Sequence, residues 1–214
     1  MPLSREKTSV FSKVYINIGA KTFHMVQKRS KINVRDLEII GVLIERKLHV
    51  RAIAQELKTS HTGVLRRIKK LVEANILDFS QKGRNNQYFL KKTAEAQAFV
   101  MMAELYKLVK TLQKYHLLRG IVEKIKQDNR IKLAVLFGSF ANGTAGKNSD
   151  IDIFIETSNK NLRKELSFLD SKLSIKIGKY DQKSQLFKEI EKKHVIIKGV
   201  EEYLEKTEFF EKIA

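Results

Sequence analysis

Hydrophobic positions in the N-terminal half recur three or four residues apart in three short stretches. This spacing predicts three short helices that each bury one face. Ser60 stands where a side chain would cap the third helix, and Asn75 stands where a left-handed residue would end it. The three stripes are Leu37, Ile40, Leu43 and Ile44; then Ile53, Ala54 and Leu57; then Val64, Leu65, Ile68, Leu71 and Val72.

Two apolar runs follow the third helix, at residues 76–79 and 87–90, and they bracket the polar segment 82–86. Short apolar runs around a glycine-containing tip predict a β-hairpin. Further along, apolar residues at helical spacing over 94–112 predict one long helix. Its apolar residues are Ala98, Met101, Met102, Leu105, Leu108, Val109 and Leu112. The period of residues 10–27 is ambiguous and predicts no element.

The C-terminal half alternates between strand and helix patterns. Residues 131–137 predict a buried strand, and in residues 151–156 the isoleucines alternate with polar or aromatic residues. A helix over 162–169, a strand over 173–177, a helix over 186–190 and a strand over 195–197 complete the pattern. This order predicts a small mixed sheet covered by helices, and hence an α+β protein. The acidic tail 201–211 predicts a solvated helix with Val200, Tyr203, Leu204 and Phe210 packed inward.

Candidate chemistry lies at the ends of the first two of these strands. Gly138 and Ser139 follow the buried strand, where a residue without a Cβ lets backbone groups approach an anion. Asp150 and Asp152 are two residues apart and therefore share one face of the next strand. Two carboxylates beside phosphate oxygens are a donor set suited to Mg²⁺. Either feature alone is usually structural, as a turn or a solvated strand edge, but the pair predicts metal-assisted phosphoryl chemistry.

The segment 136–144 followed by 149–155 resembles the minimal nucleotidyltransferases of the DNA polymerase beta superfamily. That signature is an apolar residue, Gly-Ser, a spacer and then Asp-x-Asp among apolar residues. The resemblance implies transfer of a nucleoside monophosphate from a triphosphate such as ATP to a hydroxyl, with Mg²⁺ held by Asp150 and Asp152 as catalytic residues. It also implies nucleotide contacts from Gly138, Ser139, Asn142, Ser149 and Lys176.

Two departures from the family pattern stand out. Asn142 occupies a position that is basic in many relatives. More importantly, the third family carboxylate is expected on the strand 173–177, where alternation places Ser174 and Lys176 on the relevant face. Asp170 and Asp181 flank this strand and are the alternative acids, although surface solvation accounts for both. Loss of the third acid should weaken catalysis more than nucleotide binding.

The N-terminal helices and hairpin resemble a winged helix-turn-helix domain, with Lys58 in place of a frequent turn glycine. The resemblance implies binding to double-stranded DNA. The exposed side of the third helix would enter the major groove and the hairpin tip would contact the backbone or minor groove. The predicted DNA-binding residues are Ser60, His61, Thr62, Arg66, Arg67 and Lys70 on the helix, with Lys82 and Arg84 on the wing. The alternative is a basic domain used for protein contacts.

Charge agrees with a polyanion partner. The net charge is +18, with 20 Lys and Arg against 8 Asp and Glu in residues 1–100 and 22 against 16 in the remainder. Such an excess favours nucleic acid through counterion release, although it is also compatible with a highly charged solubilising surface. The absence of cysteine excludes disulfides, thiolate metal sites and a cysteine nucleophile. No apolar run is long enough to span a membrane, so we expect no membrane partner and a cytoplasmic location.

The sequence thus predicts a winged helix-turn-helix domain at 1–92, a connecting helix at 93–116 that dimerises the chain, and a nucleotidyltransferase domain at 117–214. Two functions remain open. One is an Mg²⁺-dependent nucleotidyltransferase with a DNA-binding domain. The other is a DNA-binding regulator whose degenerate transferase domain senses a nucleotide.

Overall fold

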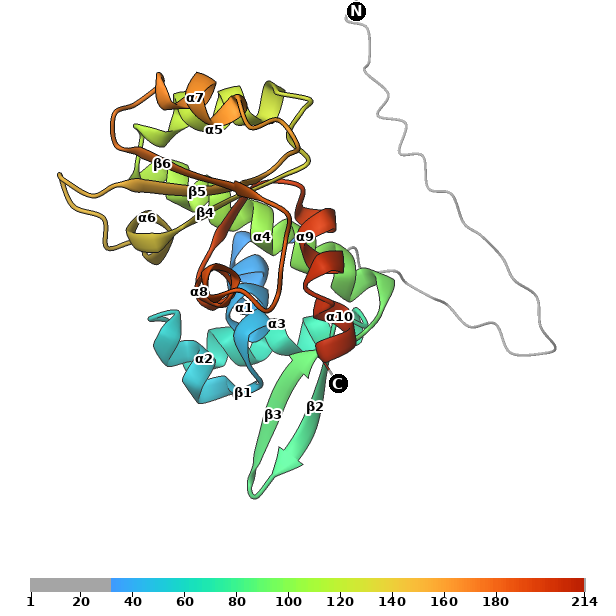
Figure 1. Cartoon of the computed structure of the whole chain (residues 1–214). Helices are drawn as coiled ribbons and strands as arrows, with labels where there is room; N and C mark the ends of the chain where they lie inside the picture. The colour runs from blue at the N-terminus through green and yellow to red at the C-terminus, as the bar shows by residue number, and fades with distance from the viewer. Residues whose placement is uncertain (1–31, 214) are drawn as a thin grey trace, which may run out of the picture. The chain divides into compact units, whose positions relative to one another are not determined.

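The computed structural model describes residues 32–213, which lie within one compact unit, Ile32–Ala214 (Figure 1). The ambiguous stretch 10–27 lies outside the described residues. Within the described part the α+β class is confirmed. Helices and strands alternate in two groups, each with its own sheet.

The first group is a winged helix-turn-helix. Helix α1 (Val34–Glu45) precedes a short strand β1 (Leu48–His49), and α2 (Val50–Glu56) and α3 (His61–Glu73) follow. Strands β2 (Leu77–Lys82) and β3 (Asn85–Leu90) form the hairpin, and the antiparallel sheet order is β1-β3-β2. The hairpin projects beyond the helices as the wing (Figure 1). The buried side of the helices matches the predicted stripes, because Ile40, Ile53 and Ile68 are all fully buried.

The predicted helix and turn signals around α3 are confirmed. The side chain of Ser60 accepts a hydrogen bond from the backbone N–H of Gly63 at 3.2 Å, as an N-cap does. Asn75 has φ +62°, the left-handed conformation expected after the last helical residue. Lys58, in the turn between α2 and α3, also has a positive φ of +47°. A lysine therefore adopts the conformation that the frequent glycine would adopt without strain.

Helix α4 (Ala94–Lys114) connects the two groups and packs against both α1 and β7 (Val195–Lys198). The expected long helix is confirmed, but its buried face differs from the expected stripe. Val100, Ala103, Glu104 and Leu108 are buried, whereas Leu105 and Val109 remain 45% and 47% exposed. The predicted buried face was wrong because α1 and β7 both pack against α4. The residues that these two elements cover, and not the helical period alone, decide which side chains are buried.

The second group is a four-stranded mixed sheet of order β6-β5-β4-β7. Strands β4 (Leu133–Phe137) and β5 (Ile151–Glu156) are antiparallel, β4 also pairs antiparallel with β7, and β6 (Leu173–Gly178) pairs parallel with β5. Helices α5 (Leu118–Gln127) and α7 (Leu162–Ser167) cover one face, while α8 (Gln185–Lys192) and α9 (Val200–Lys206) cover the other (Figure 1).

Ile151, Ile153 and Ile155 point toward the core on the side of the sheet that α5 and α7 cover, as alternation predicts. Phe154 points to the opposite face, where its ring centroid lies 4.7 Å from that of Phe187. The face that carries Asp152 is therefore apolar farther along the strand and is covered by α8, so only its first residues remain available for chemistry.

The acidic tail departs from the single helix that the sequence predicts, although Tyr203 and Leu204 are buried as expected. It forms α9 and a short α10 (Phe209–Lys212), which are separated at Glu208, a residue with φ +52°. Leu204 joins the buried core of the winged helix, with Phe209 and Phe210 packed against it. The inward packing of Leu204 and Phe210 is visible in the sequence, but their contact with the winged-helix core is not.

Candidate functional site

Gly138 and Asp152 lie in direct contact at the end of β4. Phe137, the last residue of β4, pairs with Asp152 of β5, and this register brings the following residue against the carboxylate. Gly138 has φ +68°, and a Cβ added there would lie 2.6 Å from Oδ2 of Asp152. Only glycine fits between this backbone and the carboxylate, both for space and for conformation. The structure therefore brings the glycine turn and the second aspartate together, as the sequence predicts.

Asp150 and Asp152 differ in their surroundings. Asp150 precedes β5 and is exposed, whereas Asp152 is within the strand and partly buried. Burial raises the pKa of Asp152 above its usual value, and the neighbouring Asp150 charge raises it further. A hydrogen bond with the Ser174 side chain and the positive charge of Lys176 act in the opposite direction. A cation between the two carboxylates would relieve their mutual repulsion.

Ser174 and Lys176 occupy the face of β6 that alternation assigns to them. The parallel pairing aligns Asp152 with Ser174 and Phe154 with Lys176. Ser174 is half-buried and Lys176 is exposed, while Leu173 and Ile175 are buried on the other side. The strand position directly beside Asp152 thus carries a hydroxyl in place of a third carboxylate.

The two alternative acids are engaged in local turns. Asp170 accepts a hydrogen bond from the backbone N–H of Lys172 at 2.8 Å, and Asp181 accepts one from that of Lys183 at 2.9 Å. Among residues 32–213, no group of three or more His, Asp or Glu side chains is placed to hold a metal ion. Two carboxylates nevertheless suit Mg²⁺, since it takes one or two of them and completes its octahedron with phosphate and water oxygens.

The remaining predicted nucleotide contacts are distributed around this point. Gly138 begins the short helix α6 (Gly138–Asn142), which places Ser139 beside it and Asn142 at its exposed end. Ser149 is the exception. Its hydroxyl accepts a hydrogen bond from the backbone N–H of Gly146 at 2.9 Å, and it lines a separate cavity of about 390 Å³ that also contains Ile151. This cavity contains neither Asp150 nor Asp152.

The candidate nucleic-acid interface lies on α3 and the wing. His61, Thr62, Arg66 and Lys70 are exposed, on the side of α3 opposite its buried residues Val64, Ile68 and Leu71. Lys82 and Arg84 are exposed at the wing tip, where Gly83 has φ +62°. A helix with a free polar side and a projecting basic hairpin are the two parts that a winged helix places in adjacent DNA grooves.

Arg67 differs from the other predicted DNA-binding residues. Its guanidinium donates to Oδ1 of Asp36 at 2.9 Å, and Asp36 is only 8% exposed. Oδ2 of Asp36 accepts from the backbone N–H of Asn33, which completes the capping box of α1. Arg67 therefore joins α3 to the start of α1, a role that the sequence does not reveal because the partners are 31 residues apart.

A second buried polar pair was not predicted. Glu104 of α4 is 1% exposed, its Oε1 accepts from Lys107 at 2.8 Å, and its Oε2 lies 3.8 Å from Nε2 of His194. Burial lowers the pKa of His194 below its usual value, with the negative charge of Glu104 opposing the shift. The only sequence signal was a charged residue within the apolar pattern of residues 94–112.

This fold and site define a winged helix-turn-helix joined to a nucleotidyltransferase-type sheet. Residues 118–213 match the model of the nucleotidyltransferase domain family. The matched region contains Gly138, Asp150, Asp152 and Ser174. A search of curated proteins gave no significant match.

Solved structures resemble parts of the chain at low identity. The transcriptional repressor BigR from Xylella fastidiosa is 19% identical, with a TM-score of 0.29 over 30% of this chain and 63% of the repressor, which is less than two-thirds of its length. The adhesin competence repressor from Streptococcus pyogenes is 23% identical, with a TM-score of 0.36 over 43% and 69% of the two chains. A toxin–antitoxin structure with AMP-PNP is 22% identical, with a TM-score of 0.32 over 46% and 82%.

Within the part of the chain that the structure describes, no helix has the length and apolar content needed to cross a membrane.

Proposed function

We propose that this protein is an Mg²⁺-dependent nucleotidyltransferase that transfers a nucleoside monophosphate from a nucleoside triphosphate, such as ATP, to a hydroxyl acceptor. The observation that carries the proposal is the contact between Gly138 and Asp152 within a nucleotidyltransferase domain. The glycine leaves room for phosphate groups next to the carboxylates that would hold the metal.

Each residue near this contact has a role in the proposal. Asp150 and Asp152 would hold Mg²⁺, which when bound neutralises phosphate charge and aligns the triphosphate. Ser139 and Asn142 offer hydrogen bonds to phosphate or sugar oxygens. Lys176, whose charge already acts on Asp152, would balance negative charge on the nucleotide.

Calorimetric titration with a nucleoside triphosphate tests the site. We expect saturable binding that requires Mg²⁺, and we expect the Asp150→Asn/Asp152→Asn double variant to lose the metal dependence. Asp170→Asn/Asp181→Asn is a matched control, because it also removes two carboxylates but leaves the site intact. Equal metal-dependent binding by all three proteins would refute the assignment of the site.

A second function is favoured by Ser174. Because the strand position beside Asp152 carries a hydroxyl, the domain could bind the nucleotide without transferring it. The protein would then be a DNA-binding regulator that senses a nucleotide. Incubation with an α-labelled triphosphate and the DNA-bound protein separates the two functions, since only the transferase moves label to an acceptor.

The winged helix supports binding to double-stranded DNA in both functions. Its exposed residues on α3 and its basic tip have the placement that groove binding needs. We further propose that the chain forms a homodimer, because Leu105 and Val109 leave an apolar strip on α4 that is 45% and 47% exposed. Light scattering should report a dimer that Leu105→Glu/Val109→Glu dissociates. If the wild type were a monomer, the dimer proposal would be refuted but the proposed activity would not.

A further inference from the structure

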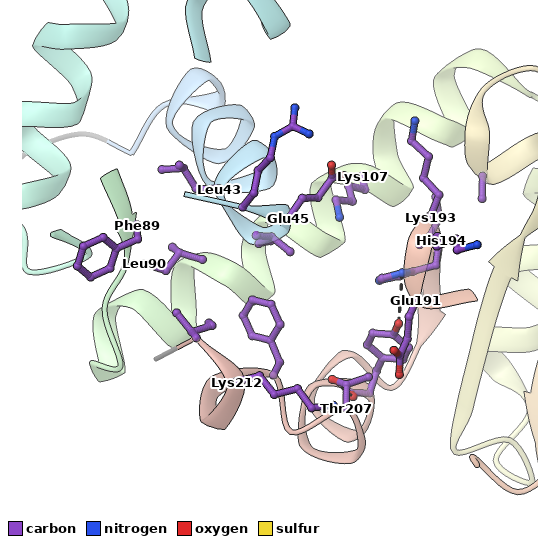
Figure 2. Close-up of a pocket in the computed structure, with 18 of the residues that line it drawn as sticks. Leu43, Glu45, Phe89, Leu90, Lys107, Glu191, Lys193, His194, Thr207 and Lys212 are labelled. Carbon is purple, nitrogen blue, oxygen red and sulfur yellow. Dashed lines mark hydrogen bonds between the residues drawn. The ribbon is translucent and has the colours of Figure 1, made fainter. Parts of the chain in front are cut away.

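The largest cavity that we describe within residues 32–213 has a volume of about 910 Å³ and contains neither Asp150 nor Asp152 (Figure 2). Its walls come from the end of α1, from β3, from the middle of α4, from the α8–β7 turn and from α9 and α10. Elements of the winged helix and of the nucleotidyltransferase domain therefore line the same space. The volume is within the range of sites for organic ligands of drug or nucleotide size.

Basic side chains dominate the charge around this cavity. Seven lysines and arginines line it, against only Glu45 and Glu191 as acids. Some of these cations already have partners: Lys107 donates to Glu104 at 2.8 Å, and Lys110 to Glu38 at 3.4 Å. In the described part of the chain, Lys192, Lys193 and Lys212 have no acidic partner within ion-pair distance. These three lysines are available for an anion.

Apolar and aromatic residues also line the cavity. Phe89, Tyr203 and Phe209 line it together with several aliphatic residues. His194 and Thr207 add polar groups, and Figure 2 shows Lys212 next to Thr207, with His194 and Lys193 on the other side of the space. Nδ1 of His194 lies 3.0 Å from the carbonyl oxygen of Ile190 and 3.2 Å from the hydroxyl of Tyr203, which holds the imidazole in place. Apolar and aromatic surface beside cationic side chains suits an organic anion.

We propose that this cavity is a binding site for an organic phosphate with an aromatic body, separate from the nucleotidyltransferase site. The phosphate would pair with Lys212, which Figure 2 shows next to Thr207, and the aromatic part would contact Tyr203 and Phe209. Glu104 does not repel the ligand strongly, because its charge is already compensated by Lys107.

Calorimetry of the full chain with 1-naphthyl phosphate in EDTA tests the proposal without a divalent ion. We expect saturable binding of one probe per chain, and weaker binding of inorganic phosphate, which lacks the aromatic part. Lys193→Ala/Lys212→Ala should weaken probe binding at least about tenfold, the loss expected when charge-assisted hydrogen bonds are removed. Lys124→Ala/Lys164→Ala, which removes two exposed charges from α5 and α7, should bind as the wild type does.

Three outcomes would overturn the site. The first is the absence of saturable binding. The second is equal weakening of probe binding by both lysine double variants, which would indicate a general charge effect. The third is loss of probe binding in Asp150→Asn/Asp152→Asn, which would place the probe at the nucleotidyltransferase site. If that aspartate variant loses Mg²⁺-dependent triphosphate binding but keeps the probe, the two sites are distinct.

Discussion

Ser174 lies directly across from Asp152 in the parallel pairing of β5 and β6. Their side chains are on the same face, and the hydrogen bond between them acts to lower the pKa of the aspartate. In the family that the site resembles, a third carboxylate is expected on this strand. A hydroxyl at this position brings no negative charge.

Restoring the acid is therefore a direct test of the transferase function. We expect Ser174→Asp to raise the rate of nucleotidyl transfer by about tenfold or more if the missing charge limits metal-assisted activation of the acceptor. Ser174→Asn is the control, because asparagine has nearly the same shape as aspartate but carries no charge. Transfer of an α-labelled nucleotide provides the measurement, and an unchanged rate in Ser174→Asp would favour the regulator.

Arg66 and Arg67 are neighbours on α3 but should respond differently to substitution. Arg66 is exposed, so Arg66→Ala should weaken duplex DNA binding by about 1–3 kcal/mol with little effect on unfolding. Arg67→Ala leaves the buried Asp36 without its partner and should lower the free energy of unfolding by about 1–3 kcal/mol. Fluorescence anisotropy over a salt series and urea unfolding measure the two effects. The prediction would be contradicted if the two variants showed the same loss of DNA affinity and the same change in the free energy of unfolding.

The left-handed Lys58 predicts a stabilising substitution. A non-glycine residue at φ +47° is strained by about 1–2 kcal/mol, and glycine removes this strain at an entropic cost of about 0.5–1 kcal/mol. Lys58→Gly should therefore raise the free energy of unfolding by about 0.5–1 kcal/mol. Lys69→Gly, at an exposed position inside α3, should lower it by about 1 kcal/mol. Urea denaturation would contradict the prediction if both variants were destabilised.

His194 should make stability depend on pH. Its pKa is lowered below 6.5 in the folded state, mainly by burial, so below pH 6.5 the unfolded chain binds a proton that the folded chain does not. The stability present above pH 6.5 is then lost as the pH falls toward the folded pKa. Glu104, Glu191, Lys107 and the Tyr203 hydroxyl surround the ring and set the size of the shift.

The measurement is urea unfolding of the wild type and of His194→Gln between pH 5.5 and pH 8. The wild type should lose more stability on acidification than the variant, by up to about 1.4 kcal/mol per pH unit. Equal pH dependence in the two proteins would mean that Glu104 compensates the burial of His194 fully.

The sequence by itself determined the elements and the local chemistry of this protein. Helical spacing located α1 to α4, the cap at Ser60 and the left-handed Asn75 were visible as residue types, and alternation placed Ser174 on its face of β6. These features depend on interactions between residues a few positions apart, or on the twofold period of a strand, and such interactions are encoded locally.

Tertiary structure alone decided which distant residues meet. The ion pair of Arg67 with Asp36, the approach of His194 to Glu104 and the burial of Leu204 in the winged-helix core each join segments far apart in the chain. The cavity between α1, α4 and the C-terminal helices also has walls from segments that are far apart in the sequence. A hydrophobic period shows that a face is buried but not what covers it, because the partner is chosen by the packing of whole elements.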